Sequence, residues 1–326
     1  MSAVLGWLSV VVVLGVAGAV LGAVLVAVGL MLFGGVLEDV DPRRRFWMLS
    51  ALSFSPLVAG MLVLLVAFYP SLLDAFGLVS DHCGTHPGHS LHLCFLHHPP
   101  PPVSMPLLVL TLVPVAFVTR RWIGEIATTT GSLRWAHRLI PLARFDEERQ
   151  IYIVESDRLL AMTVGFFRRR IVICDRLESW LTPEQFAAVI AHERAHCRRF
   201  DGVITFVLRL ATACHFPEVR AQLAGAIQLS SEQCCDQAAA AVDDRFTVAE
   251  AILAVERIRQ QPKNFVGVQC FCTPGVEQRV MALLRNDWRL PNGPLSSAVA
   301  LVVVVLLFNN LHALHHLVEH GFAWLV

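Results

Sequence analysis

Residues 182–197 read TPEQFAAVIAHERAHC, and the rest of the chain is interpreted outward from this stretch. Its beginning carries the signals of a helix start. Thr182 is a good N-cap, Pro183 suits the first helical position, and Gln185 completes a capping box. Phe186 and the apolar residues after it give the helix a side that can be buried. The stretch therefore predicts one amphipathic helix that runs through both of its histidines.

His192 and His196 are four residues apart on this helix, so their imidazoles project from one face about one turn apart. Two imidazoles at that separation can bind one Zn²⁺. Glu193 lies beside them, where it can take a proton from a water that the metal activates. The H-E-x-x-H pattern also arises by chance, so a third ligand is needed to identify a metal centre.

A third ligand is present in the alanine-rich, helix-favouring run SEQCCDQAAA, residues 231–240. Glu232 supplies it, and Asp236, one turn later, can accept a hydrogen bond from a ligand imidazole and fix its tautomer. Three protein ligands with an open position for water are typical of a catalytic zinc rather than a structural one. We therefore predict a zinc-dependent metalloendopeptidase with a single Zn²⁺ per chain and Glu193 as its base.

The composition is too apolar for an ordinary soluble protein. Hydrophobic residues make up 55% of the 326 residues, charged residues only 16%, and the mean hydropathy is +0.59. The formal net charge of zero excludes no class of partner. The positions of the charges are more informative, because all 26 Lys and Arg lie within residues 43–45 or 120–289. By the positive-inside rule we expect both regions in the cytoplasm.

The apolar stretches and the basic regions together predict a membrane protein with four transmembrane helices and both termini outside the cytoplasm. The first span has no basic n-region, so we expect it to be retained rather than cleaved as a signal peptide. Residues 1–119 are predicted to contain three spans, at 3–37, 46–69 and about 103–119, with an outer loop at 70–104 between the second and third. An amphipathic linker on the membrane surface follows at 120–143, and then a cytoplasmic peptidase domain at 144–290. Residues 291–326 contain the fourth span, at about 298–311, and a His-rich outer tail.

Within the peptidase domain, β-rich runs precede the zinc helix at 151–154, 160–164 and 171–174. Further helices are expected around Glu232, at about 247–260 and at 275–285. The predicted fold class is an α+β membrane protein: four transmembrane helices with a cytoplasmic zinc metallopeptidase domain inserted before the last span.

The outer loop has no Lys or Arg but is rich in histidine. Its side chains can bind Cu, Zn or Ni or respond to acid, and the residues concerned are His82, Cys83, His86, His89, His92, Cys94, His97 and His98. Their spacing is irregular, so a polar loop without a ligand is an equal alternative. Cys83 and Cys94 can form a disulfide in an oxidising compartment.

Three segments resemble the BlaR/MecR-type membrane zinc metallopeptidases: TVGFFRRRIVI at 163–173, LTPEQFAAVIAHERAHCRRFD at 181–201 and EQCCD at 232–236. The resemblance implies a gluzincin fold on a four-span membrane unit, with the active site facing the cytosol. It implies His192, His196 and Glu232 as ligands, Glu193 as the base and Asp236 behind a ligand. It also implies a signalling role, in which an outside stimulus activates the protease and a transcriptional repressor of the BlaI type is removed.

The antibiotic sensors of that family carry a penicillin-binding domain after the last span. Residues 291–326 leave no room for one, and the chain has no S-x-x-K nucleophile motif. We therefore do not expect these residues to sense β-lactams by acylation, and the stimulus stays open.

Two structural roles also stay open. Arg279 is either a transition-state stabiliser or a plain salt-bridge partner. The strand at 160–164 either binds the substrate as an added strand or is only a structural edge.

Three functions stay open as well. The first is cleavage of a cytoplasmic DNA-binding repressor or of the protease itself. The second is membrane-protein quality control of the HtpX type, and the third is a non-proteolytic metal-sensing receptor. The expected partners are a protein substrate and the lipid bilayer, with no direct nucleic-acid contact, and a homodimer is left open.

Overall fold

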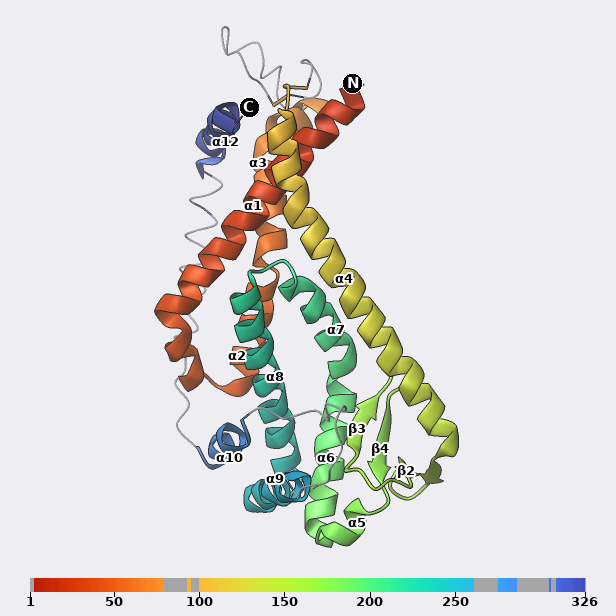
Figure 1. The fold of residues 1–326 in the computed structure, drawn as a ribbon. Coiled ribbons are helices and arrows are strands. Elements are labelled where there is room, and N and C mark those ends of the chain that lie inside the picture. Colours follow the sequence, from red (N-terminus) through yellow and green to blue (C-terminus); the bar gives the residue numbers. More distant parts are fainter. Residues whose placement is uncertain are drawn as a thin grey trace.

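The computed structural model describes residues 3–78, 93–94, 100–260, 275–285, 305 and 309–325. The molecule is elongated, with long apolar helices and both chain ends at one end and the sheet at the other (Figure 1). The described part is mostly helical with one small sheet. Within it, three helices are long and apolar enough to cross a membrane: Ala3–Asp39, Ser55–Ala75 and Met105–Leu142. The predicted fourth span at 298–311 lies mostly outside the described residues.

Helices α1 (Ala3–Phe33) and α3 (Ser55–Ala75) pack along each other in this membrane bundle. A Cβ at Gly18 would lie 2.8 Å from the carbonyl oxygen of Ala59, and one at Gly60 would lie 2.7 Å from the carbonyl oxygen of Gly15. The missing side chains let the two backbones approach closely, as small residues do between membrane helices. After α1 the chain passes through a 3₁₀ turn, η1 (Gly34–Asp39).

Residues 46–69, expected as one span, are divided by a break at Phe54. Before the break, α2 (Pro42–Ser53) begins at the N-cap Asp41 and packs against α8 (Pro217–Ala240). The buried Arg45 of α2 donates to the hydroxyl of Ser230 (2.9 Å) in α8. The apolar side of α2 is thus covered by protein, and only α3 is a candidate span.

The linker expected at 120–143 is not a separate element. Helix α4 (Met105–Leu139) continues through it unbroken, despite Pro114, and ends in the 3₁₀ turn η3 (Ile140–Leu142). Contacts with α7 (Asp201–Thr212) hold its second half. Arg121 donates to the carbonyl oxygens of Ala213 and His215 (3.0 and 2.8 Å), at the end of α7. A segment predicted to lie on the membrane surface therefore joins the membrane bundle to the peptidase helices.

Four short strands form a mixed sheet in the order β1-β2-β4-β3. They are β1 (Arg144–Asp146), β2 (Ile151–Val154), β3 (Ala161–Val164) and β4 (Arg170–Cys174). The central pair β2–β4 is parallel and the two outer pairs are antiparallel. The sequence does not predict β1, because its three residues are too short and too polar to show a strand pattern. The order of the strands makes β3 an edge of the sheet.

Helix α5 (Leu177–Trp180) leads from the sheet into α6 (Pro183–Arg199). The capping box is formed, with Thr182 and Gln185 exchanging two hydrogen bonds of 3.3 Å. The sheet-facing side of α6 joins the core that includes Ile151 and Ile173. α6 ends at Phe200, which has a left-handed φ of 60°, and α7 starts at the next residue. This sharp break in the helix leaves the first residue of α7 beside the last turn of α6.

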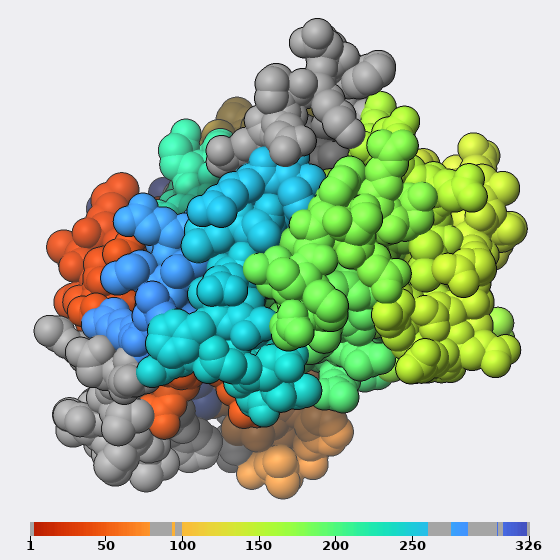
Figure 2. Space-filling view, turned by 90° about the horizontal axis from the view of Figure 1, so that it is seen from below, coloured from red at the N-terminus to blue at the C-terminus, as the bar shows by residue number. Residues whose placement is uncertain are grey.

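Helices α8, α9 (Arg245–Gln260) and α10 (Val276–Leu284) complete the peptidase part. α9 packs against α6, α8 and α10 around a core that contains Ala188, Ala239 and Leu283. Seen from below, α10, α9 and the green segment of α6 follow one another across the face, with the sheet side beyond (Figure 2). The α6–α8 pair, which carries the predicted zinc ligands, is therefore held between the sheet and two further helices.

At the other end of the molecule, α12 (Leu311–Leu325) packs against α3 (Figure 1). Phe322 of α12 is buried there in one core with Val10, Ala67 and Leu93. The region expected as a His-rich tail is therefore helical from Leu311 and forms part of the bundle.

Candidate metal centre

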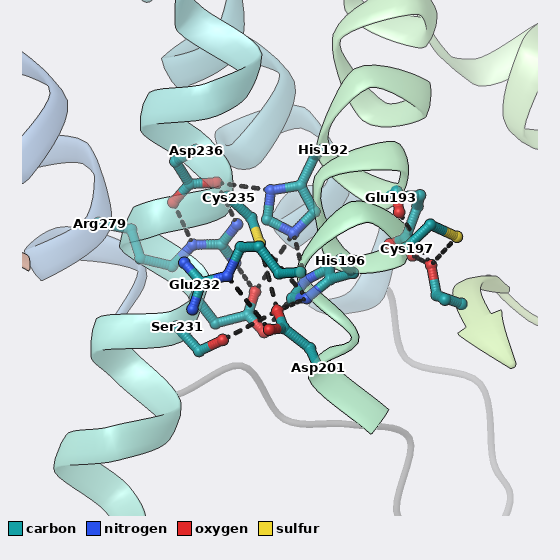
Figure 3. A network of polar contacts seen from close by, with 12 residues as sticks. His192, Glu193, His196, Cys197, Asp201, Ser231, Glu232, Cys235, Asp236 and Arg279 are labelled. Carbon is teal, nitrogen blue, oxygen red and sulfur yellow. Dashed lines mark hydrogen bonds and ion pairs between the residues drawn. The ribbon is translucent and has the colours of Figure 1, made fainter. Parts of the chain in front are cut away.

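His192 and His196 of α6 and Glu232 of α8 converge on one point (Figure 3). The two Nε2 atoms are 3.0 Å apart. Glu232 Oε2 lies 3.4 Å from Nε2 of His192, and its Oε1 lies 3.7 Å from Nε2 of His196. The three side chains are 13–17% exposed, so the donor atoms are mostly enclosed by protein.

These separations fit a tetrahedral zinc. Zinc–nitrogen and zinc–oxygen distances of ~2.0–2.1 Å place neighbouring donors ~3.3 Å apart. Two neutral imidazoles and one carboxylate are also the donor set that zinc takes in hydrolases with an open fourth position. The residues present therefore fit the metal that the sequence predicts.

Behind His192, Asp236 and Arg279 form a buried pair. Asp236 Oδ1 accepts from Nδ1 of His192 at 2.9 Å, which directs the other ring nitrogen, Nε2, toward Glu232. Burial raises the pKa of Asp236, but hydrogen bonds from Arg279 and His192 outweigh it and bring the pKa to about 2. Burial lowers the pKa of His192, whereas hydrogen bonds to Asp236 and Glu232 more than offset this and place it at about 10. The carboxylates of Asp236 and Glu232 thus stabilise positive charge in the centre.

Behind His196 lies Asp201, a residue to which the sequence analysis gives no role. Its Oδ2 is 2.6 Å from Nδ1 of His196 and accepts from the hydroxyl of Ser231 at 3.1 Å. Burial raises the pKa of Asp201, but the contacts with His196 and Arg199 outweigh it, so the net shift is downward. The one signal in the sequence is an Asp five residues after the second histidine. The break at Phe200 that brings this Asp beside His196 cannot be predicted from spacing.

A second group, His196, Asp201 and Cys235, also brings metal-ligating atoms together. It suits a metal less well, because Nδ1 of His196 is already engaged with Asp201. Burial strongly raises the pKa of the Cys235 thiol, and a neutral thiol is a poor ligand. We therefore take this group as support for His196 rather than as a site of its own.

Glu193 does not join the donor cluster. It lies on the side of α6 that faces the sheet, where its Oε2 accepts from the hydroxyl of Thr163 in β3 at 2.9 Å (Figure 3). The same hydroxyl is 3.0 Å from the backbone carbonyl oxygen of Glu193. The carboxylate is 7% exposed and sits between α6 and the edge strand. Thr163 was not singled out from the sequence, because only the packing of β3 on α6 gives it a role.

Arg279 lies in the centre but is committed to carboxylates. Its Nε and Nη2 donate to both oxygens of Asp236 (2.8 and 2.7 Å), and its Nη1 is 3.4 Å from Glu232 Oε2. This geometry favours the salt-bridge hypothesis over the transition-state one.

Of the candidates in the outer loop, only Cys94 lies within the described residues, where it is buried, so the histidines and Cys83 remain predictions.

The family model of the BlaR1 peptidase M56 matches residues 107–283, which is more than half of the chain. The chain belongs to this family. The match runs from α4 through the sheet, α6 and α8 to the end of α10, so every residue of the metal centre falls inside it. No curated protein and no solved structure is significantly similar to the chain.

Membership in the BlaR1 peptidase family identifies a membrane metallopeptidase with a protein as its substrate. The three apolar helices agree with the membrane context. The M56 match begins at residue 107, so nearly all of α4 lies within it.

Proposed function

We propose that the protein is a zinc-dependent endopeptidase in which His192, His196 and Glu232 bind one Zn²⁺. The observation that carries the proposal is the convergence of two Nε2 atoms and a carboxylate, with an aspartate behind each imidazole. Such carboxylate–histidine pairs fix the tautomer and raise the basicity of the ligand. A structural site would be closed by a fourth protein ligand, whereas this centre offers three.

The metal and the side chains of Glu193, Thr163 and Arg279 have different proposed roles in catalysis. When bound, Zn²⁺ supplies polarisation of the scissile carbonyl and makes water acidic enough to attack. Glu193 takes the proton from the attacking water and passes it to the leaving amine. Thr163 engages Oε2 of Glu193, which leaves Oε1 to accept that proton. Arg279 holds Asp236 and Glu232 in place, and so acts through the ligands.

The substrate is proposed to bind along β3. This strand is an edge of the sheet and faces α6 at Glu193 through Thr163. A peptide that adds to the edge by backbone hydrogen bonds would pass between the strand and the metal centre. The same geometry would bind many sequences, because main-chain pairing does not read side chains.

The proposed biological substrate is a cytoplasmic transcriptional repressor of the BlaI type, or the protease itself. The support is the family membership and the distribution of Lys and Arg, from which the positive-inside rule predicts a cytoplasmic location for residues 120–289. The proposed topology puts both termini on the outer side of a bacterial inner membrane. A regulatory protease makes one discrete cut in a DNA-binding partner, whereas a quality-control protease of the HtpX type degrades many membrane proteins.

The decisive measurement is the zinc content of the detergent-purified full chain together with its peptidase activity. We expect about one zinc per wild-type chain, much less for Glu232→Ala, and wild-type zinc without cleavage for Glu193→Gln. Glu147→Gln, in the exposed turn before β2, is the matched control and keeps both properties. Full zinc in Glu232→Ala would remove Glu232 from the site. Full cleavage by Glu193→Gln would show that Glu193 is not the base, whereas a zinc-loaded wild type that cleaves nothing would favour the non-proteolytic receptor.

A further inference from the structure

The end of the membrane bundle away from the sheet carries a second pair of histidines. His312 and His316 are four residues apart on α12. Their Nε2 atoms are 3.1 Å apart, and their ring centroids are 4.5 Å apart at 84°. The metal ligands His192 and His196 have nearly the same geometry, with values of 3.0 Å, 4.8 Å and 75°. The pair on α12 therefore repeats the histidine half of the peptidase centre.

The other ring nitrogen of each histidine is also engaged. Nδ1 of His316 lies 3.3 Å from Oε2 of Glu319, and Nδ1 of His312 lies 3.4 Å from the hydroxyl of Tyr69 in α3. Metal-bound histidines characteristically have such a partner on the second nitrogen, because it fixes the tautomer and aims the first nitrogen at the ion. Both Nε2 atoms are thus directed at one another.

The tautomers show how an ion would be accommodated. The carboxylate of Glu319 holds the proton of His316 on Nδ1, so its Nε2 carries a lone pair. The Tyr69 hydroxyl can donate to His312 or accept from it. When it accepts, the proton of His312 is also on Nδ1, and two lone pairs meet at 3.1 Å. To bind a cation between the two Nε2 atoms, His312 needs only to carry its proton on Nδ1 instead of Nε2. The pair loses no proton overall.

The residues around His312 and His316 favour the binding of a positive ion. Glu319 is 6% exposed and also accepts from the backbone N–H of Leu93 at 3.0 Å. Its Oε1 lies 3.3 Å from Nε2 of His315, whose Nδ1 donates to the carbonyl oxygen of Val66 in α3. No Lys or Arg occurs in residues 46–119 or 290–326, so these segments bring no competing cation. The carboxylate accepts from the backbone of Leu93 and faces two imidazoles of its own helix.

We propose that His312 and His316 form a second metal site, for a borderline divalent transition metal. Imidazole suits Cu²⁺, Ni²⁺ and Zn²⁺, and the Irving–Williams order makes Cu²⁺ the tightest of them. Glu319 and Tyr69 are positioning residues for the two ligands. The site is independent of the peptidase centre. Through Glu319 and Leu93 a bound ion is tied to the loop that precedes α4 as well as to α12.

The test is Cu²⁺ binding to the zinc-loaded full chain in detergent, counted at equilibrium. We expect the wild type to bind one more Cu²⁺ than either His312→Gln or His316→Gln, because two imidazoles are needed for the site. The control His137→Gln removes an exposed histidine of α4 and keeps the wild-type count. Tyr69→Phe keeps both ligands and is expected to bind more weakly, by about tenfold, as for other partners behind a ligand. An unchanged count in both glutamine variants would overturn the proposal.

A second measurement on the wild type covers the case in which a glutamine variant fails to fold. Diethyl pyrocarbonate modifies imidazole nitrogens, and peptide mass spectrometry reads the modification at each histidine. We expect Cu²⁺ to protect His312 and His316 and to leave His137 reactive. Equal modification of the pair with and without Cu²⁺ would also overturn the proposal.

Discussion

Nδ1 of His196 and Oδ2 of Asp201 lie 2.6 Å apart across the break between two consecutive helices. The two residues belong to different helices, α6 and α7, that meet at Phe200 in a left-handed conformation. The guanidinium of Arg169 covers the ring of Phe200 at 3.4 Å and supports this corner. The break at Phe200 thereby gives His196 the same kind of carboxylate partner that Asp236 provides for His192.

Asp201→Asn is expected to weaken zinc binding by ~10–100-fold, because an amide polarises the imidazole of His196 less than a carboxylate does. Zinc affinity is measured by competition with a chelating dye on the purified full chain. Asp157→Asn is the control, since Asp157 pairs with Arg176 in an exposed turn. Equal zinc affinity in Asp201→Asn and the wild type would show that Asp201 has no influence on the ligand.

Thr163→Val is expected to lower the turnover number roughly tenfold while leaving the zinc content unchanged. Valine keeps the shape of threonine but cannot donate to Glu193, and a hydrogen bond to a charged group contributes about 1.5–3 kcal/mol. Thr163→Ser keeps the hydroxyl and should retain most of the activity. A loss of zinc in Thr163→Val would instead show that β3 supports the metal ligands rather than the base.

Arg279→Gln is expected to destabilise the fold by about 3–5 kcal/mol, because it leaves the buried carboxylate of Asp236 without its bidentate partner. The measurement is the free energy of unfolding, with Arg279→Lys as an intermediate case, since lysine cannot bind both oxygens. The double variant Arg279→Gln/Asp236→Asn should recover part of the loss. If Arg279→Gln unfolds like the wild type but is inactive, Arg279 acts on the transition state.

Gly18→Val is expected to destabilise the membrane bundle by about 1–3 kcal/mol, because its side chain would meet the backbone of α3. Thermal unfolding in detergent measures this effect. Gly29→Val offers a matched control on the same helix, since a Cβ at Gly29 has no atom within 4 Å among the described residues. Similar melting of the two variants would contradict close contact between α1 and α3.

Much of the metal centre follows from local sequence. The start of α6 is set by Thr182 and Gln185, and helical periodicity alone puts His192 and His196 on one face. Glu232 and Asp236 are likewise one turn apart within a single helix. These relationships depend on neighbours within four residues, which is why they can be predicted without the fold.

The tertiary structure decided the relationships between distant segments. It placed Asp201 behind His196, Thr163 against Glu193 and Arg279 on Asp236. It also divided the expected second span at Phe54 and extended α4 through the expected linker. Apolar periodicity shows that a helix face will be buried, but it does not show whether lipid or another helix will cover it. The sequence by itself thus determined the start of α6 and the shared face of His192 and His196, whereas packing between helices decided which side chains lie behind them.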